Sequence, residues 1–246
     1  MSELVYGVHA VEVLLKRNSD SVQRLYVQRN RHDQRVHKLV KLAQAKNITV
    51  EQKERVELDE MTQQRHQGVI AQCHQLKEKQ YHEKHIPDLL DALEEAPFIL
   101  ILDGVTDPHN LGACLRSADA AGVHMVIAPK DNAASITDVV RKVACGAAES
   151  VPFIPVTNLV RTMKLLQERN VWIAGTAGEA EQDIYQANLK GGLAIVMGAE
   201  GDGMRRLTRE NCDFLIKIPM AGEVSSLNVS VATGVTLFEA VRQRNQ

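Results

Sequence analysis

Short apolar runs alternate with helical patterns from residue 89 to residue 246, and this alternation is the strongest constraint on the fold. The run at 98–102 (FILIL) is continuous, which is typical of a strand buried on both faces. Further strands are predicted at 125–127, 151–156, 171–174, 193–197 and 214–218, and helices at 110–121, 137–146, 158–170, 204–211 and 226–243. The pattern predicts a mostly parallel α/β sheet covered on both faces, with ligands bound beyond the carboxyl ends of the strands.

A smaller α/β pattern precedes the pattern at residues 89–246. Strands are predicted at 25–27, 48–51 and 69–71, and helices at 6–16, 36–46 and 56–61. The polar, charged stretch that follows has the composition of a linker. We therefore predict a small domain at 1–75, a linker at 76–88 and a larger domain at 89–246.

The two parts differ in charge. The chain has 29 Lys and Arg and 31 Asp and Glu, of which 14 and 10 lie in residues 1–80, so the first part is basic and the remainder, with 15 and 21, is acidic. A basic N-terminal part indicates contact with a polyanion, although a solvated helix face would give a similar count. The candidates for phosphate contacts, any one of which can equally be solvated surface, are Arg24, Arg29, Arg31, Arg35, Lys38 and Arg65.

Other classes of protein are disfavoured. No apolar run approaches the ~20 residues of a membrane span, and the N-terminus lacks the pattern of a signal peptide. The cysteines at 73, 114, 145 and 212 form no Cys-x-x-Cys motif, so each is expected to be a reduced, buried residue. These features predict a cytoplasmic protein without a metal site.

The loop after the 98–102 strand carries the first group of candidate site residues. Asp107 and Pro108 indicate a turn, and His109 or Asn110 is expected to cap the next helix. Arg116 would then lie about one and a half turns into that helix, near the strand ends. A helix cap followed by a surface arginine explains this loop equally well.

The loop at 198–203 (GAEGDG) carries three glycines around Glu200, which would let the backbone approach a ligand closely. It is not a dinucleotide fingerprint, because Arg206 stands where that motif needs glycine or alanine, and no Gly-Lys-Ser/Thr follows as in a phosphate loop. The carboxylate between glycines is the more informative feature.

The third loop, after the 214–218 strand, contains Pro219 and Gly222, which break regular structure. Ser225 or Ser226 is expected to cap the last helix. Capping explains one serine, but it does not explain Ser226, Asn228 and Ser230 together.

Together the three loops resemble the signature motifs of the SpoU branch of the SPOUT methyltransferases. The matching text is DPHNLG at 107–112 with Arg116, VMGAEG at 196–201, and IPM at 218–220 with SLNVS at 226–230. Within that branch, the chain is most similar to the bacterial enzymes that methylate a guanosine 2′-hydroxyl in large-subunit (23S) ribosomal RNA. The first unit resembles the substrate-binding module related to ribosomal protein L30e.

The resemblance implies a deep trefoil knot at the end of the sheet, a homodimer and S-adenosyl-L-methionine as cofactor. Pattern alone predicts an unknotted sheet, because knots are nearly absent from proteins. The cofactor-binding residues that the resemblance implies are Thr176, Met197, Gly198, Ile218, Met220, Leu227 and Asn228.

For catalysis, the resemblance implies Asn110, Arg116, Glu200, Ser226 and Asn228. A guanidinium stays protonated, so we expect Arg116 to hold the target phosphate and stabilise the developing alkoxide. Asn110 would orient the ribose, and Glu200 would hold Arg116 or take part in proton transfer.

Three other functions stay open from sequence: a methyltransferase acting on transfer RNA, an RNA-binding protein with an inactive methyltransferase domain, and an NAD- or nucleotide-dependent enzyme. The last lacks a phosphate-binding fingerprint, and the intact motif residues argue against the second. The motifs encode the chemistry rather than the RNA, so only the first unit bears on the choice of substrate.

Overall fold

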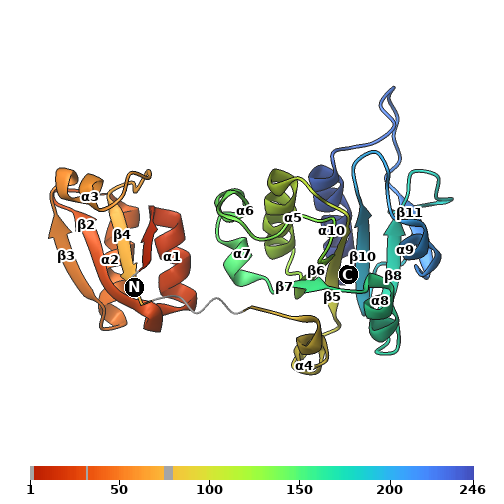
Figure 1. Ribbon diagram of the computed structural model, residues 1–246, viewed down its shortest axis with the longest axis horizontal. Helices are drawn as coiled ribbons and strands as arrows, with labels where there is room; N and C mark the ends of the chain where they lie inside the picture. The colour runs from red at the N-terminus through yellow and green to blue at the C-terminus, as the bar shows by residue number, and fades with distance from the viewer. Residues whose placement is uncertain (1–2, 32, 75–79) are drawn as a thin grey trace. The chain divides into compact units, whose positions relative to one another are not determined.

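The computed structural model describes residues 3–31, 33–74 and 80–246 (Figure 1). The chain divides into two compact units, Met1–Lys79 and Gln80–Gln246. Each has its own hydrophobic core, as expected for units that fold separately.

The first unit is a four-stranded sheet in the order β1-β4-β2-β3, with β2 and β3 parallel and the other pairs antiparallel. Helices α1 and α2 cover one face and bury Val11, Leu15 and Leu39 against it. The elements are β1 (Glu3–Tyr6), α1 (Val8–Arg17), η1 (Ser19–Ser21), β2 (Val22–Gln28), α2 (Gln34–Ala45), β3 (Thr49–Lys53), α3 (Arg55–Met61) and β4 (Val69–Cys73).

The predicted strands and helices of this unit are confirmed, but the sequence analysis missed β1 and began the first helix too early. Tyr6 ends β1, and Gly7 breaks the chain at φ +95° before α1 begins. Only a residue without a Cβ adopts this φ readily, so Gly7 sets the boundary.

The second unit is a seven-stranded parallel sheet in the order β7-β6-β5-β10-β8-β11-β9. The predicted parallel α/β sheet is therefore confirmed. The strands are β5 (Phe98–Asp103), β6 (Met125–Pro129), β7 (Phe153–Val156), β8 (Trp172–Thr176), β9 (Gln182–Asp183), β10 (Leu193–Gly198) and β11 (Phe214–Lys217).

Helices cover both faces of this sheet. Side chains of β5 alternate between two cores, with Leu100 and Leu102 facing α5, α6, α7 and α10, and Ile99 and Ile101 facing α4 and α8. The helices are η2 (Glu83–His85), α4 (Ile86–Asp91), α5 (Pro108–Ala120), α6 (Asp138–Ala144), α7 (Ala147–Ser150), α8 (Leu159–Gln167), α9 (Arg206–Glu210) and α10 (Val229–Arg244).

The second half of the expected linker is folded. Residues 83–91 form η2 and α4, Ile86 is buried, and Glu83 accepts hydrogen bonds from the guanidinium of Arg161 at 2.6 and 3.2 Å. The sequence analysis missed this because few apolar residues carry the contact. Residues 75–79 of the expected first domain and linker lie outside the described residues.

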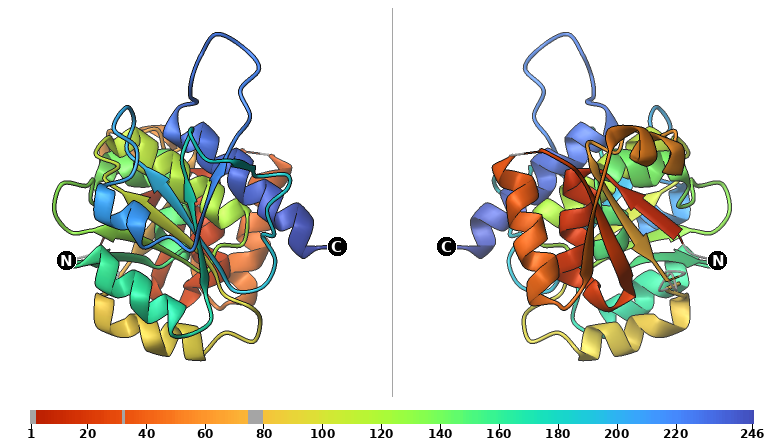
Figure 2. Two further views of the ribbon diagram at one scale, coloured as in Figure 1. Left: turned by 90° about the vertical axis from the view of Figure 1, so that its right-hand side faces the viewer. Right: turned by 90° about the vertical axis from the view of Figure 1, so that its left-hand side faces the viewer.

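The last helix begins at Val229, three residues later than expected. The loop between β11 and α10 extends away from the sheet in both views (Figures 1 and 2). Helix α10 then packs against α5 and β10. Strand β10 lies beside β8, on the opposite side of β8 from β11. Within the described residues, no helix is both long and apolar enough to cross a membrane.

Candidate active site

The loops that follow β8, β10 and β11 surround a hollow of about 680 Å³. These strands are parallel, so their carboxyl ends meet at one edge of the sheet, as the sequence analysis expected. The volume of the hollow lies within the range of small-molecule pockets. The predicted residues that line it are Thr176, Met197, Gly198, Glu200, Ile218, Met220, Ser226, Leu227 and Asn228.

The glycine-rich loop after β10 turns back on itself. Ala199 and Gly203 exchange two backbone hydrogen bonds, at 3.0 and 3.1 Å. A Cβ on Gly198 would lie only 2.2 Å from the carbonyl carbon of Gly203 and 2.3 Å from the nitrogen of Met204. Glycine is thus required at 198 by the return of the chain, whereas the sequence analysis explained it by the approach of a ligand.

Apolar side chains form one wall of the hollow. Met197 is the penultimate residue of β10, and Ile218, Met220 and Leu227 come from the β11–α10 loop. The Thr176 hydroxyl donates to the carbonyl of Val196 at 2.9 Å. This bond ties the end of β8 to β10.

Asn228 brings the three motifs together. Its Nδ2 donates to Asn110 Oδ1 at 3.0 Å and to Glu200 Oε1, and its Oδ1 accepts from the Ser230 hydroxyl at 2.6 Å. The Val229 amide lies 3.4 Å from the same Glu200 oxygen. Four polar side chains from α5, the β10 loop and the start of α10 therefore form one hydrogen-bonded group beside the hollow.

The helix caps differ from the expected ones. Asp107, rather than His109 or Asn110, caps α5 by accepting from the Asn110 amide at 2.9 Å. Asn228, rather than Ser225 or Ser226, caps α10 by accepting from the Ser230 amide at 2.9 Å. Because Asp107 caps α5, the Asn110 side chain can accept the hydrogen bond from Asn228. Asn228 itself both caps α10 and makes this bond.

Arg116 does not join this group. Its side chain is exposed on α5 and has no hydrogen bond or ion pair within the described part of the chain. The expected contact with Glu200 is absent, because Glu200 accepts from Asn228 and Val229 instead. Six residues of helix turn through about 600°, so Arg116 projects roughly 120° away from Asn110.

Sequence reasoning missed Asp103, the last residue of β5. Its buried carboxylate accepts from the backbone nitrogen of Arg205 at 2.8 Å and from the Arg205 guanidinium at 2.6 Å. The bond anchors the far end of the glycine-rich loop to the sheet. An acidic residue at the end of a continuous apolar strand was the available signal.

The cysteines differ in their surroundings. Burial raises the pKa of the Cys114 thiol to about 11, with Glu200 adding to the rise, and burial raises that of Cys212 to about 12. Cys73 is buried too, whereas Cys145 is exposed, so the expectation of burial is wrong for Cys145. All four are free thiols.

The six predicted RNA contacts of the first unit fall into three groups. Arg24 pairs with Glu51 at 2.7 Å, and Arg29 pairs with Glu54 at 3.0 Å. Lys38 is exposed on α2. The remaining three line a second hollow, of about 660 Å³, within the first unit: Arg31, Arg35 and Arg65. Among the described residues, no group of three or more His, Cys, Asp or Glu is placed to hold a metal ion.

The parallel sheet and the hollow at its carboxyl edge define the second unit as a ligand-binding α/β domain of the kind found in enzymes. Residues 97–238 match the model of the SpoU rRNA methylase family, and residues 4–79 match the model for RNA 2′-O ribose methyltransferase substrate binding. The chain belongs to the SpoU rRNA methylase family.

The chain is similar to several named enzymes and solved structures. The 23S rRNA (guanosine-2′-O-)-methyltransferase RlmB of Escherichia coli (strain K12) is 58% identical over 246 residues, which span all of both chains. The SpoU methyltransferase AviRb of Streptomyces viridochromogenes, solved with AdoMet, has a TM-score of 0.71 at 23% identity and covers 98% of this chain and 90% of its own. The TrmH/SpoU tRNA modifying enzyme of A. aeolicus has a TM-score of 0.56 at 31% identity, covering 66% of this chain and 84% of its own.

Proposed function

We propose that this protein uses S-adenosyl-L-methionine to methylate the 2′-hydroxyl of a guanosine in large-subunit (23S) ribosomal RNA. The observation that carries the proposal is the hydrogen-bonded group of Asn110, Glu200 and Asn228 at the rim of the 680 Å³ hollow. Relatedness to RlmB along the whole chain supports the substrate.

The residues around the hollow suit the cofactor. Ile218, Met220 and Leu227 offer an apolar surface to an adenine ring, and the backbone of the β8, β10 and β11 loops supplies polar groups. Glu200 adds a carboxylate to the lining, which would attract the positive charge of the sulfonium. When bound, S-adenosylmethionine supplies the electrophilic methyl group.

The ribose hydroxyl must be aligned with that methyl group and must lose its proton as it attacks. Asn110 and Asn228 are hydrogen-bonded to each other and present amide groups that can orient the ribose. Glu200 accepts a hydrogen bond from Asn228, lines the hollow, and is the candidate proton acceptor. Ser226 lies in the exposed β11–α10 loop and lines the same hollow, so it would complete the site.

Arg116 has a different role in the proposal. Its guanidinium has no partner among the residues described, so it is available to the target phosphate and to the alkoxide that develops at the 2′-oxygen. Arg116 projects away from Asn110. Bound RNA or a second subunit would therefore have to bridge Arg116 and the hydrogen-bonded group of Asn110, Glu200 and Asn228.

A homodimer is part of the proposal. Val231 and Phe238 are 51% and 50% exposed, and they lie seven residues apart on one face of α10. An apolar stripe next to Asn228 suits a second copy of the chain, as the family resemblance implies.

A trefoil knot is also part of the proposal. Gln243 of α10 accepts from the Leu189 amide at 3.0 Å, and Arg244 bonds to the carbonyls of Gly191 and Ala96, the latter at 2.6 Å. The end of the C-terminal helix therefore contacts the segment before β10, as passage of the C-terminal segment through an earlier loop would require.

The first unit, which resembles ribosomal protein L30e, would bind the RNA, and the protein would act in the cytoplasm. The match to an RNA substrate-binding model at residues 4–79 supports this role. The tRNA modifying enzyme covers only 66% of this chain, which favours ribosomal RNA over transfer RNA.

The test is methyl transfer from labelled S-adenosylmethionine to unmodified large-subunit rRNA and, in parallel, to transfer RNA, with Arg116→Ala as the control. Label on rRNA that the variant fails to transfer is the expected result. Label on transfer RNA alone would overturn the substrate, and cofactor binding without label on either RNA would favour an RNA-binding protein with an inactive domain.

A further inference from the structure

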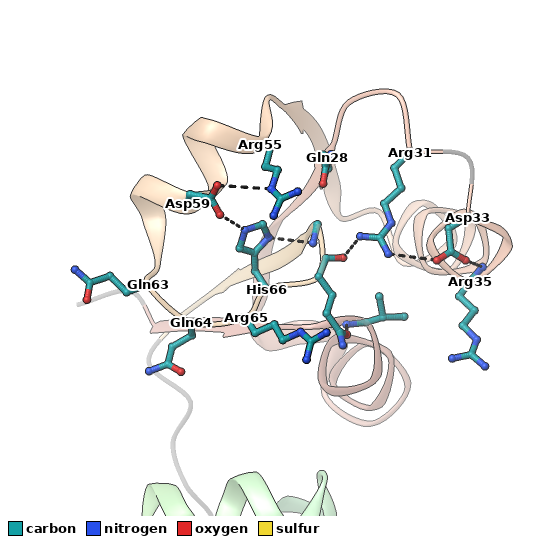
Figure 3. Close-up of a pocket in the computed structure, with 13 residues that line it drawn as sticks. Gln28, Arg31, Asp33, Arg35, Arg55, Asp59, Gln63, Gln64, Arg65 and His66 are labelled. Carbon is teal, nitrogen blue, oxygen red and sulfur yellow. Dashed lines mark hydrogen bonds and ion pairs between the residues drawn. The ribbon is translucent and has the colours of Figure 1, made fainter.

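The first unit contains a hollow of about 660 Å³ that is separate from the candidate active site (Figure 3). It is formed by the end of β2, the start of α2, helix α3 and the loop before β4. We call it the arginine–glutamine pocket, after the lining residues that matter here: Gln28, Arg31, Arg35, Gln63, Gln64 and Arg65.

Part of its wall is held in place by a buried histidine. The Gly68 amide donates to His66 Nδ1 at 3.0 Å, so the ring proton of neutral His66 lies on Nε2, which donates to Asp59 Oδ1 at 2.7 Å. His66 is only 7% exposed. Both ring nitrogens are therefore used inside the protein, and the ring serves to fix the wall.

Arg31 holds the opposite side. Its guanidinium donates to the carbonyl of Gln67 and pairs with Asp33 at 3.3 Å (Figure 3). Gly68 has φ +69°, and a Cβ there would lie 2.5 Å from Arg31 Nη1. Glycine at 68 thus lets the arginine cross the loop closely, which gives the pocket a preorganised floor.

Other lining groups are free. The side chains of Arg35, Arg65, Gln63 and Gln64 have no hydrogen bond or ion pair to any residue that the structure describes. Four arginines line the pocket against two carboxylates, so the pocket is positively charged overall. Among its lining residues no tyrosine, phenylalanine or tryptophan offers a stacking surface.

We propose that the arginine–glutamine pocket binds one unpaired nucleotide of the RNA substrate. Its volume suits a single small ligand, whereas an intact helix could only lie across its mouth. Arg35 and Arg65 would pair with the flanking phosphates, since guanidinium groups suit phosphate oxygens.

The glutamines would then contact the base. The amides of Gln63 and Gln64 offer both donors and acceptors to a base edge, and proteins that read RNA sequence do so mostly on unstacked bases. Arginine planes would take the place of aromatic stacking surfaces. The assignment rests on the proposed function, because it takes the polyanion to be RNA.

The experiment measures RNA binding by the full-length protein without cofactor. The probe is a hairpin with an unpaired loop, chosen as the tightest binder among overlapping segments of unmodified large-subunit rRNA. A fully paired duplex of equal length serves as the second probe. The Arg35→Gln/Arg65→Gln variant is compared with Lys16→Gln/Lys53→Gln, which removes equal charge from lysines of the same unit that are already paired with Glu12 and Glu57.

Each lost phosphate contact lowers the magnitude of the slope of log K against log salt concentration by about 0.7. At 0.1 M salt, this change corresponds to about a fivefold loss of affinity. We expect the Arg35/Arg65 variant to bind the hairpin about 25-fold more weakly, and the control variant to lose less than about threefold. Gln63→Ala/Gln64→Ala should weaken hairpin binding without changing the salt slope. The two pocket variants should change duplex binding less than hairpin binding, and the control variant should change neither by more than about threefold.

Wild-type affinity of the Arg35/Arg65 variant for the hairpin would overturn the proposal. So would an equal loss on hairpin and duplex, which would indicate a general polyanion surface. Because binding is measured without methyl transfer, the two proposals fail separately. A wild-type protein that binds the hairpin through these residues but methylates no rRNA would keep the pocket and overturn the proposed reaction.

Discussion

Replacing Gly198 by alanine tests the construction of the candidate active site. The new Cβ would lie 2.2 Å from the Gly203 carbonyl carbon, whereas ordinary contact begins near 3.4 Å, so the returning chain must move by about 1.2 Å. That shift breaks the two backbone hydrogen bonds between Ala199 and Gly203, each worth about 1 kcal/mol. With overpacking strain of about 1–3 kcal/mol, we expect the free energy of unfolding to fall by roughly 3–5 kcal/mol.

The same shift moves Glu200 away from Asn228, so the affinity for S-adenosylmethionine should fall as well. Urea denaturation and calorimetric titration measure the two effects. Gly178→Ala is the matched control, because Gly178 lines the same hollow and has no atom within 4 Å of a Cβ, so stability should change by less than about 0.5 kcal/mol. A Gly198→Ala protein with wild-type stability and cofactor affinity would refute the reasoning.

Three further predictions concern single side chains. Asp103→Asn should destabilise the second unit by about 2–3 kcal/mol in chemical denaturation, because the buried carboxylate loses charge-assisted bonds to Arg205; an unchanged midpoint would contradict this. Arg116→Lys should lower kcat about 100-fold with little change in cofactor affinity, and near wild-type turnover would show that the planar guanidinium is unnecessary. The hydrogen bond from Arg242 lowers the pKa of Glu239 from 4.5 to about 2. The ionised Glu239 carboxylate therefore contributes to stability above pH 4.5, and this contribution is lost as the pH falls toward 2. The stability difference between wild type and Glu239→Gln should therefore shrink between pH 5 and pH 3, and a constant difference would show that this hydrogen bond does not act in the folded protein.

Much of the fold follows from local patterns. The continuous apolar run at β5 and the regular alternation of strands and helices predict the parallel sheet, because strands buried on both faces need apolar residues throughout. Short elements such as β9 and α7 were missed, since two to four residues carry no readable period. The order of strands depends on long-range packing that periodicity does not contain.

The candidate site was predictable in its parts but not in its contacts. Motif residues from three loops were expected to meet, and Asn228 does contact Asn110 and Glu200. Of the two roles expected for Glu200, the pairing with Arg116 is not formed in this structure, because the helical turn directs Arg116 elsewhere. Asp103 was overlooked since its partner, Arg205, lies 102 residues away in sequence.

The most direct test of the central claim is nucleoside analysis of unmodified large-subunit rRNA after reaction with labelled S-adenosylmethionine. The account predicts that all label is recovered in a single 2′-O-methylguanosine, and that Asn228→Ala, which breaks the bonds to Asn110 and Glu200, removes most of it. Label on a base or on another nucleoside, or undiminished label with Asn228→Ala, would contradict it.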